Sequence, residues 1–235
     1  MKVTASLIIV AAGSGKRIKS KTPKPFIQLC GKPILIHTLE KFRNISCIKE
    51  IILVLQKNDI NWVIKKYGNV LAKLDVTKIV AGGKRRQDSV YNGLISSNIN
   101  SDLIIIHDVV RPFVTKEIIL SAINTAKKYG AAVPAIPAKD TIKLIGQNNI
   151  VKNTFNRQSL YQVQTPQVFK RAILLKAYRK SLKTGFLATD DSQIVEMAGF
   201  PVHMVKGGET NIKITTPADI SIANALLAPL EILCR

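Results

Sequence analysis

Residues 6–17 read SLIIVAAGSGKR: an apolar run passes directly into a loop with two glycines and a basic pair. An apolar run without polar alternation is typical of a buried strand in a parallel sheet, because helices cover both faces of such a sheet. The glycines let backbone amides approach a phosphate chain. Lys16 and Arg17 place positive charge where the phosphate oxygens would lie. This stretch therefore predicts an α/β fold with an anion-binding loop after its first strand.

The loop matches neither of the common nucleotide-binding fingerprints. The third glycine of the dinucleotide motif is absent, and so is the Gly-Lys-Ser/Thr of a Walker A loop. Two glycines after a strand are about as often an ordinary tight turn as a phosphate site. The basic pair directly after them favours phosphate.

Strand-like and helix-like segments alternate along most of the chain. Strands are expected at residues 6–10, 50–55, 76–80, 103–106, 131–136 and 202–205, with a short extended piece at 212–215. Helices are expected at residues 33–42, 60–67, 87–97, 116–129, 171–180, 190–198 and 217–227. This alternation predicts a doubly wound, mostly parallel sheet of Rossmann-like type. Its ligand crevice is expected at the carboxyl ends of the strands.

Residues 139–164 break this rhythm. Two short runs, 141–145 and 150–152, flank the polar turn 146–149, which is typical of a β-hairpin. A projecting hairpin buries little against its own subunit, so it favours pairing with a second chain. A flexible surface hairpin is the alternative. We expect residues 1–235 to form one domain, with 139–164 as a dimerisation arm.

The composition allows several classes of protein and excludes others. The 235 residues carry a formal net charge of +20, which suggests a nucleic-acid binder, but the basic residues are dispersed and only 6% of residues are aromatic. No apolar run approaches the ~18 residues of a membrane span. Cys30, Cys47 and Cys234 lie far apart, which argues against a disulfide framework or a zinc site. A cytoplasmic protein is expected.

A second loop, residues 21–26, is one of several motifs that together resemble those of a known family. Prolines on both sides of Lys24 stiffen this loop and reduce the entropy lost in fixing the lysine at a site. Ala-Ala-Gly-x-Gly-x-Arg followed by Pro-Lys resembles the signature of nucleotidyltransferases that activate sugar phosphates. Further blocks follow in order at residues 82–90, 107–112, 139–143, 164–167, 189–191 and 211–215. Together they resemble the 2-C-methyl-D-erythritol 4-phosphate cytidylyltransferase family of the non-mevalonate isoprenoid pathway, over residues 8–219 or so.

The resemblance implies a reaction and its participants. A phosphate oxygen of the acceptor, a polyol phosphate, attacks the α-phosphorus of CTP and expels pyrophosphate. Arg17 and Lys24 match the family's catalytic residues, which stabilise the transition state, and fixed cations suit such highly charged reactants. Mg²⁺ is expected as the cofactor, held mainly by the CTP phosphates rather than by protein ligands. A homodimer through the arm is implied, and no nucleic-acid or membrane partner.

Binding roles follow from the same matches. The nucleotide-binding positions are Ala11, Ala12, Gly13, Ser14, Gly15, Gly83, Ser89, Val109 and Lys213. The substrate-binding positions are Asp108, Arg111, Thr141, Arg157, Thr165 and Lys213, with Thr141 and Arg157 serving the partner's site.

Some of these positions have a structural alternative, and some depart from the family. Ser89 and Asp108 are also suited to capping a helix or turn, and Arg111 is suited to holding Asp108, to touching substrate, or to both. Val109 and Val110 stand where relatives often carry alanines, which would narrow the crevice near the nucleotide. Lys84 replaces an acidic residue of some relatives.

Two other functions stay open from the sequence. Ribitol-5-phosphate cytidylyltransferase shares the architecture and most of the blocks, so the donor is better determined than the acceptor. A basic, non-catalytic nucleic-acid-binding protein is the alternative of another class, and it predicts strongly salt-dependent binding without turnover of CTP.

Overall fold

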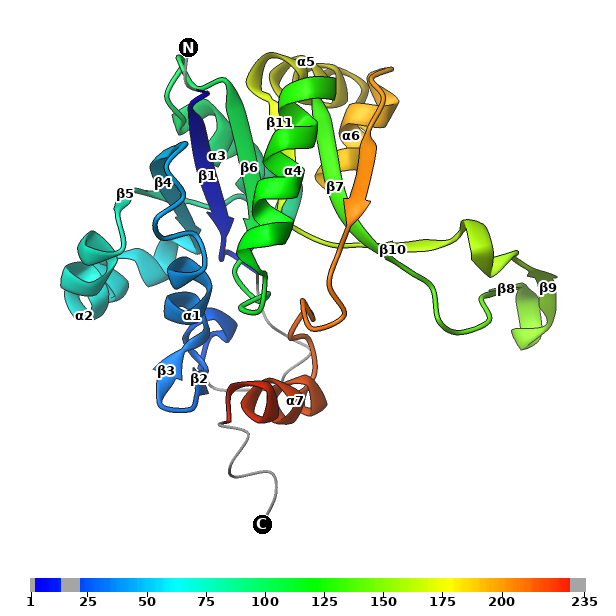
Figure 1. Ribbon diagram of the computed structural model, residues 1–235, viewed down its shortest axis with the longest axis horizontal. Helices are drawn as coiled ribbons and strands as arrows, with labels where there is room; N and C mark the ends of the chain where they lie inside the picture. The colour runs from blue at the N-terminus through cyan, green and yellow to red at the C-terminus, as the bar shows by residue number, and fades with distance from the viewer. Residues whose placement is uncertain (1–2, 14–21, 229–235) are drawn as a thin grey trace.

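The computed structural model describes residues 3–13 and 22–228 (Figure 1). The strands are β1 Ala5–Val10, β2 Gln28–Leu29, β3 Lys32–Pro33, β4 Ile48–Leu55, β5 Val76–Ala81, β6 Leu103–Asp108, β7 Ala131–Pro137, β8 Lys143–Ile145, β9 Val151–Thr154, β10 Tyr161–Val163, β11 Gln167–Lys170 and β12 His203–Lys206. The α-helices are α1 Ile34–Glu40, α2 Ile60–Lys73, α3 Arg86–Ser96, α4 Lys116–Tyr129, α5 Arg171–Thr184, α6 Asp191–Met197 and α7 Pro217–Leu227.

One mixed sheet organises the described part of the molecule. Its strand order is β10-β7-β11-β6-β1-β4-β5, and β12 pairs with β7. The strands β6, β1, β4 and β5 are parallel, whereas β11 runs antiparallel to both of its neighbours. The predicted doubly wound α/β fold is confirmed, and its parallel half carries the carboxyl edge at which a ligand crevice is expected.

Buried side chains form a core on each face of this sheet. Along β1, Leu7 and Ile9 belong to one core, which is covered by α1, α2 and α4. The alternate residues Ile8 and Val10 belong to the other core, which is covered by α3, α5 and α6. Side chains of a strand alternate between its faces, so burial of both sets explains why β1 is apolar throughout.

Several predicted elements are confirmed, including their ends. The side chain of Thr115 accepts a hydrogen bond from the Ile118 amide at the start of α4, and Gly130 ends that helix with φ +100°. Such a left-handed residue is the usual end of a helix, and glycine adopts it without steric penalty. Helix α2 continues through Gly68 to Lys73, beyond the expected end at residue 67.

Several segments differ from the expectation. The short strands β2, β3, β10 and β11 were not predicted, and β11, which begins at the last residue of the 164–167 block, has four residues that carry no repeating pattern of their own. Strand β6 extends to Asp108, so this carboxylate is carried by the last residue of the strand. Residues 212–215 form no strand; one hydrogen bond from the Ile214 amide to the Val110 carbonyl, 2.9 Å, ties them to the end of β6.

The predicted hairpin is confirmed and projects from the body as an arm (Figure 1). Strands β8 and β9 pair antiparallel, with Lys143 opposite Thr154 and Leu144 opposite Asn153. Every residue of both strands is exposed in the single chain. Strand β10 then leads the chain back to the sheet by pairing with β7.

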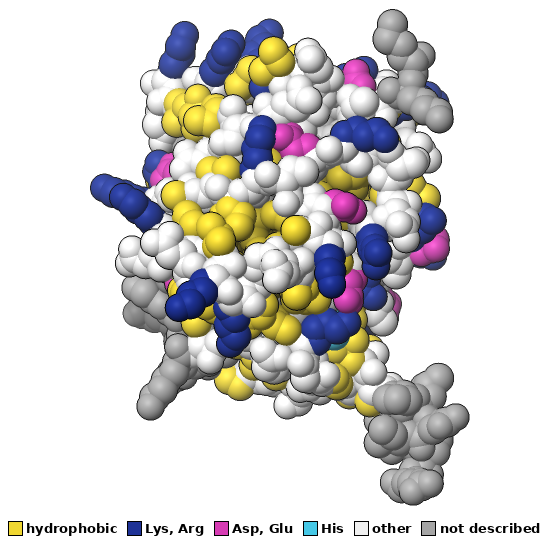
Figure 2. Space-filling view, turned by 90° about the vertical axis from the view of Figure 1, so that its left-hand side faces the viewer, with side chains coloured by type: hydrophobic (Ala, Val, Ile, Leu, Met, Phe, Trp, Pro, Cys, Tyr) yellow, Lys and Arg dark blue, Asp and Glu magenta, His cyan; other side chains and the backbone are white. Residues whose placement is uncertain are grey.

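The distribution of surface charge bears on whether the chain binds nucleic acid, and the helix lengths bear on whether a helix could span a membrane. Figure 2 shows one face on which Lys and Arg side chains stand apart, with neutral and apolar surface between them. Such dispersal differs from the continuous basic stripe that tracks a nucleic-acid backbone. Within residues 3–13 and 22–228, no helix is long and apolar enough to cross a membrane.

Two glycines inside helices make a matched test of this packing. A Cβ at Gly93 on α3 would lie 2.7 Å from Ile8 Cγ2 and 3.2 Å from Val54 Cγ2, whereas a Cβ at Gly68 on α2 would meet only Ile64, at 3.9 Å. We expect Gly93→Ala to lower the free energy of unfolding by about 1–3 kcal/mol through overpacking. Gly68→Ala should raise it by about 0.5–1 kcal/mol through helix propensity. Urea denaturation measures both, and equal effects of the two substitutions would contradict this account.

Candidate active site

A cavity of about 630 Å³ opens at the carboxyl edge of the parallel strands. Its described lining comes from the segments after β1, β4 and β5, the end of β6, the short 3₁₀ turn Lys24–Phe26 (η2), the start of α3, and Lys213. Parallel strands bring their carboxyl ends to one edge, so distant loops meet there. The predicted position of the ligand crevice is confirmed.

The lining of this cavity is strongly basic. The described lining holds one carboxylate, that of Asp108, and six cationic side chains, those of Lys24, Lys57, Lys84, Arg85, Arg86 and Lys213. The lining thus carries more positive than negative charge, and such an excess in a recess attracts and retains polyanions. The cavity therefore suits a ligand with several phosphate groups.

The structure brings together most of the expected nucleotide-binding positions. The described ones that line the cavity are Ala11, Ala12, Gly13, Gly83, Ser89, Val109 and Lys213. Ser14, Gly15 and Arg17 lie outside the described residues. Val110 lines the cavity beside Val109, and both valines are buried.

Close packing behind the nucleotide positions makes small residues necessary there. A Cβ at Gly82 would lie 2.4 Å from the Ala12 Cβ and 2.9 Å from the Ser89 Oγ. Ser89 accepts a hydrogen bond from the Gly83 amide at 3.1 Å and donates one to the Arg85 carbonyl at 3.0 Å. The Ser89 hydroxyl therefore fixes the turn before α3, whereas the N-cap position of that helix is taken by Arg85.

Lys24 lines the cavity and lies on the turn η2, which is held in place by a hydrogen bond and by aromatic packing. The Phe26 amide donates to the Pro23 carbonyl at 2.9 Å and closes the turn. The Phe26 ring packs edge-on against Trp62, with centroids 4.5 Å apart, and stacks on Tyr67 at 5.8 Å. Burial of an aromatic side chain is worth several kcal/mol, so this contact anchors the turn to α2.

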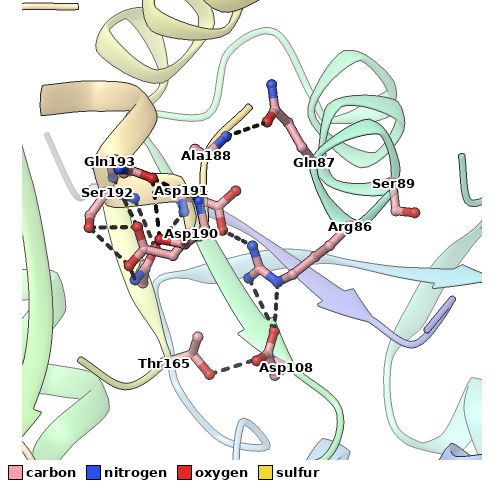
Figure 3. Close-up of polar contacts among 12 residues, drawn as sticks. Arg86, Gln87, Ser89, Asp108, Thr165, Ala188, Asp190, Asp191, Ser192 and Gln193 are labelled. Atoms are coloured by element: carbon pink, nitrogen blue, oxygen red, sulfur yellow. Dashed lines mark hydrogen bonds and ion pairs between the residues drawn. The ribbon is translucent and has the colours of Figure 1, made fainter. Parts of the chain in front are cut away.

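Asp108 is the electrostatic centre of the site (Figure 3). Its Oδ1 lies 3.1 Å from Nη2 of Arg86, and its Oδ2 lies 2.6 Å from Nζ of Lys213. Burial alone would raise the pKa of this carboxyl, but Arg86 and Lys213 outweigh burial and hold the pKa well below its usual range. Asp108 is therefore ionised at every physiological pH.

A buried histidine supports Asp108 from behind. The Arg111 carbonyl can only accept, so Nε2 of His107 carries the proton and donates to it at 3.1 Å. Nδ1 then accepts from the Thr165 hydroxyl at 3.0 Å, and Thr165 in turn accepts from the Asp108 amide at 3.1 Å. Burial lowers the pKa of His107 to about 4, so the ring stays neutral.

Arg111 and Thr165 thus lie behind the cavity and do not line it. The Arg111 guanidinium donates to the Asn211 carbonyl at 2.7 Å, and Nδ2 of the Asn211 side chain donates to the Thr165 carbonyl at 3.0 Å. The Arg111 backbone amide also donates to the Asp108 carbonyl at 3.1 Å, and the charge of the Arg111 guanidinium favours the ionised Asp108 carboxylate. Both residues hold the wall of the site together in this state.

Lys213 owes its position to the segment around it. The adjacent Ile214 is fully buried, and its amide is tied to the end of β6 as described above. Asn211 is also fully buried and bonds to Gln164 at 3.0 Å. These contacts hold an irregular segment against β6, so Lys213 faces Asp108.

Thr141 and Arg157 lie on the arm, away from this cavity. Both are exposed, and the Arg157 guanidinium donates to the Lys139 carbonyl at 3.3 Å. The structure of one chain therefore does not bring them to the other predicted site residues.

Sequence reasoning missed Arg86 as a site residue. Its guanidinium lines the cavity and bonds both to Asp108 and to Asp191, the latter at 2.7 Å. Arg86 and Asp191 were part of matched blocks, but their separation of 105 positions along the chain gave no signal that they pair.

A doubly wound sheet with a basic cavity of about 630 Å³ at its carboxyl edge, and a paired Asp and Lys inside it, fits an enzyme that transfers a phosphate-bearing group, such as a nucleotidyltransferase. The chain belongs to the 2-C-methyl-D-erythritol 4-phosphate cytidylyltransferase family, whose model matches residues 5–229.

Relatives and solved structures agree with this family. The chain is 43% identical to the cytidylyltransferase of that name from Caldanaerobacter subterraneus subsp. tengcongensis, over 96% of this chain and 99% of the relative. It is 45% identical to that of Alkaliphilus metalliredigens, over 96% and 93%. Among solved structures, 4-diphosphocytidyl-2C-methyl-D-erythritol synthase from Anaerococcus prevotii superposes with a TM-score of 0.84 at 38% identity, covering 96% of each chain.

The activity follows from the family. The chain is a cytidylyltransferase that acts on 2-C-methyl-D-erythritol 4-phosphate in the non-mevalonate isoprenoid pathway. Of the functions left open by the sequence, the methylerythritol phosphate enzyme is the one that the comparisons support.

The buried His107 makes stability depend on pH in a testable way. In the unfolded chain its pKa returns to the ordinary value of 6.5, whereas burial lowers it to about 4 in the folded chain. As pH falls through this window, the unfolded state takes up a proton that the folded state refuses, so the stability present above pH 6.5 is lost. The loss contributed by this group is about 3 kcal/mol.

Unfolding free energies of wild type and His107→Gln at pH 7 and pH 4.5 measure this contribution. The fall between the two pH values should be smaller in the variant, since the carboxylates contribute equally to both proteins. Parallel pH curves would show that His107 does not titrate as described.

Proposed function

We propose that Arg17 and Lys24 stabilise the transition state of the cytidylyl transfer. A phosphate oxygen of the acceptor forms a bond to the α-phosphorus of CTP as the bond from that phosphorus to the bridging oxygen breaks, and pyrophosphate leaves with the electron pair. Both reactants are already anionic, so no protein nucleophile is required, and positioned cations reduce the barrier. The place of Lys24 on the cavity wall supports its role.

The single observation that carries the proposed acceptor site is the contact between Lys213 and Asp108 inside the cavity, 2.6 Å. We assign the Lys213 ammonium to phosphate oxygens of both CTP and the acceptor. The Asp108 carboxylate is assigned to the acceptor hydroxyl groups, since an ionised carboxylate accepts strong hydrogen bonds from them. Arg111 and Thr165 are assigned to acceptor binding through the wall that they hold.

The nucleotide is assigned to the segment 11–15 together with Gly83, Ser89 and Val109. The Ala11 amide already donates to the Val54 carbonyl at 2.8 Å, so it fixes the segment rather than the ligand. Ala12 and Gly13 are then assigned to the base through their backbone groups, and the close packing of Gly82 against Ala12 supports this assignment by fixing that segment. Ser14 and Gly15 are assigned to the triphosphate.

Mg²⁺ is proposed as the cofactor, held mainly by CTP phosphate oxygens. The donor set supports this assignment: within the described residues, the cavity offers the Asp108 carboxylate, and both of its oxygens already contact cations. When bound, the ion would neutralise phosphate charge and orient the leaving pyrophosphate.

The arm is proposed to join two chains in a homodimer, so that Thr141 and Arg157 reach the partner's site. Its exposed apolar side chains support this proposal, because they gain burial only from another chain. The largest exposed fractions on the arm are 64% for Ile150, 50% for Val151 and 49% for Ile145. The free thiols of Cys30 and Cys47 fit a reducing compartment, and we propose the cytoplasm.

Pyrophosphate release from CTP tests the catalytic assignment. We expect Arg17→Ala and Lys24→Ala each to lower kcat by about 100-fold or more, because each removes a cation aimed at the transition state. The dissociation constant of CTP should change by less than about 5-fold, since other groups still bind the nucleotide.

The control is Lys66→Ala, a surface lysine whose ammonium lies over the Tyr67 ring on α2, away from the described cavity lining. It should turn over normally. Normal turnover in Arg17→Ala and Lys24→Ala would overturn their assignment, and release with ribitol 5-phosphate but not with methylerythritol phosphate would overturn the acceptor.

Light scattering during gel filtration tests the dimer. Wild type should show twice the chain mass of 25.9 kDa, and Leu144→Asp/Ile150→Asp should show the single mass with loss of activity, because charges on the arm oppose its burial. Ile99→Asp is the matched control, since Ile99 is 77% exposed outside the arm, and it should remain dimeric. A monomeric wild type at micromolar concentration would contradict the proposal.

A further inference from the structure

Arg86 is held between two carboxylates that come from different elements, Asp108 on β6 and Asp191 on α6 (Figure 3). Its Nε and Nη2 each lie 3.1 Å from Oδ1 of Asp108 at the end of β6. Its Nη1 lies 2.7 Å from Oδ2 of Asp191 at the start of α6. The planar guanidinium fixes the angle between its donors, so the place of one carboxylate constrains the other.

Asp191 itself is held on every side and is completely buried. Its Oδ1 accepts from the Tyr178 hydroxyl at 2.6 Å, and its amide donates to the Gln167 side-chain oxygen at 3.1 Å. Gln167 in turn donates to Asp190 at 2.7 Å. Asp191 is not among the residues that line the cavity, so it reaches the cavity only through Arg86.

The proposed reaction requires the Arg86 side chain to stay in place, because Arg86 restrains the Asp108 carboxylate while the substrates bind. In this state Arg86 holds Oδ1 of Asp108 while Lys213 holds Oδ2. When the phosphates of both substrates enter, they draw the Lys213 ammonium toward themselves, and Arg86 remains as the restraint on the carboxylate. A restrained carboxylate binds acceptor hydroxyls with less loss of entropy than one that rotates.

We propose that Asp191 is a positioning residue of the cytidylyl transfer, which holds Arg86 and through it keeps the Asp108 carboxylate turned toward the acceptor. This inference rests on the proposed role of Asp108 in binding the acceptor. Tyr178 completes the chain of contacts by holding Asp191. The orientation of a group in the cavity is thus set by a tyrosine in the helical layer behind the sheet.

A purely structural ion pair would have a different signature. Breaking a buried ion pair destabilises a protein whatever it does for catalysis, so a loss of stability alone decides nothing. A positioning role predicts instead that the KM for the acceptor rises selectively. It also predicts that Asp191 loses its effect once Arg86 can no longer transmit it.

Steady-state kinetics of the full-length enzyme with methylerythritol phosphate and CTP test the proposal. Asp191→Asn should raise the acceptor KM by about 10-fold or more, because it removes a charged hydrogen bond to Arg86. Tyr178→Phe keeps both charges and should raise it by about 3-fold or more. The KM for CTP should change by less than about 3-fold in both variants.

The matched control is Tyr91→Phe. The Tyr91 ring stacks on that of Tyr178, with centroids 5.8 Å apart, but its hydroxyl takes no part in the contacts around Asp191. It should leave both KM values unchanged. If Tyr178→Phe has the same kinetics as Tyr91→Phe while remaining folded by circular dichroism, the proposal is overturned, whether or not Asp191→Asn folds.

A double-mutant cycle with Arg86→Lys completes the test. In the Arg86→Lys background, Asp191→Asn should raise the acceptor KM by less than about 2-fold, whereas independent effects that multiply would overturn the proposal. Asp108→Asn separates this inference from the function on which it rests. If Asp108→Asn leaves the acceptor KM unchanged, both the acceptor-binding role of Asp108 and the positioning role of Asp191 are overturned. If Asp108→Asn raises the acceptor KM but Asp191→Asn does not, only the positioning role of Asp191 is overturned.

Discussion

The ionised carboxylate of Asp108, buried at the end of β6, is the constraint on which the site depends. A buried charge is unfavourable unless opposite charges and hydrogen bonds compensate for it. Arg86 supplies one compensating charge from the start of α3, and Lys213 supplies the other from an irregular segment near the end of the chain. Three distant parts of the chain therefore meet at one side chain, and that meeting shapes the cavity.

The basic residues fall into two groups: a few that line the cavity and serve its function, and the others, which are dispersed along the chain. Six cations against one carboxylate in the described lining match the charge of CTP and a phosphate acceptor. On the face shown in Figure 2, Lys and Arg side chains are dispersed. The net charge of +20 therefore carries little functional information, whereas the few placed cations carry much.

Much of the site was predictable because its residues lie in short motifs at the ends of strands. The segment after β1, the Gly82–Gly83 pair and Asp108 all follow apolar runs, and parallel strands bring such ends together. Lys213 was found through the family resemblance alone. Arg86, Asp191 and Tyr178 were missed in their roles, since a pairing across about a hundred residues leaves no periodic or local trace in one sequence.

The sequence by itself determined the layers of the fold and the hairpin arm, because strand periodicity and helix caps are local properties of the chain. The chemical class of the site followed from the resemblance of its ordered motifs to a known family. The tertiary structure alone decided which charges compensate one another, that Arg111 and Thr165 stand behind the cavity, and that β11 enters the sheet antiparallel. Those outcomes depend on distances between segments remote in sequence. Only the packed chain sets such distances.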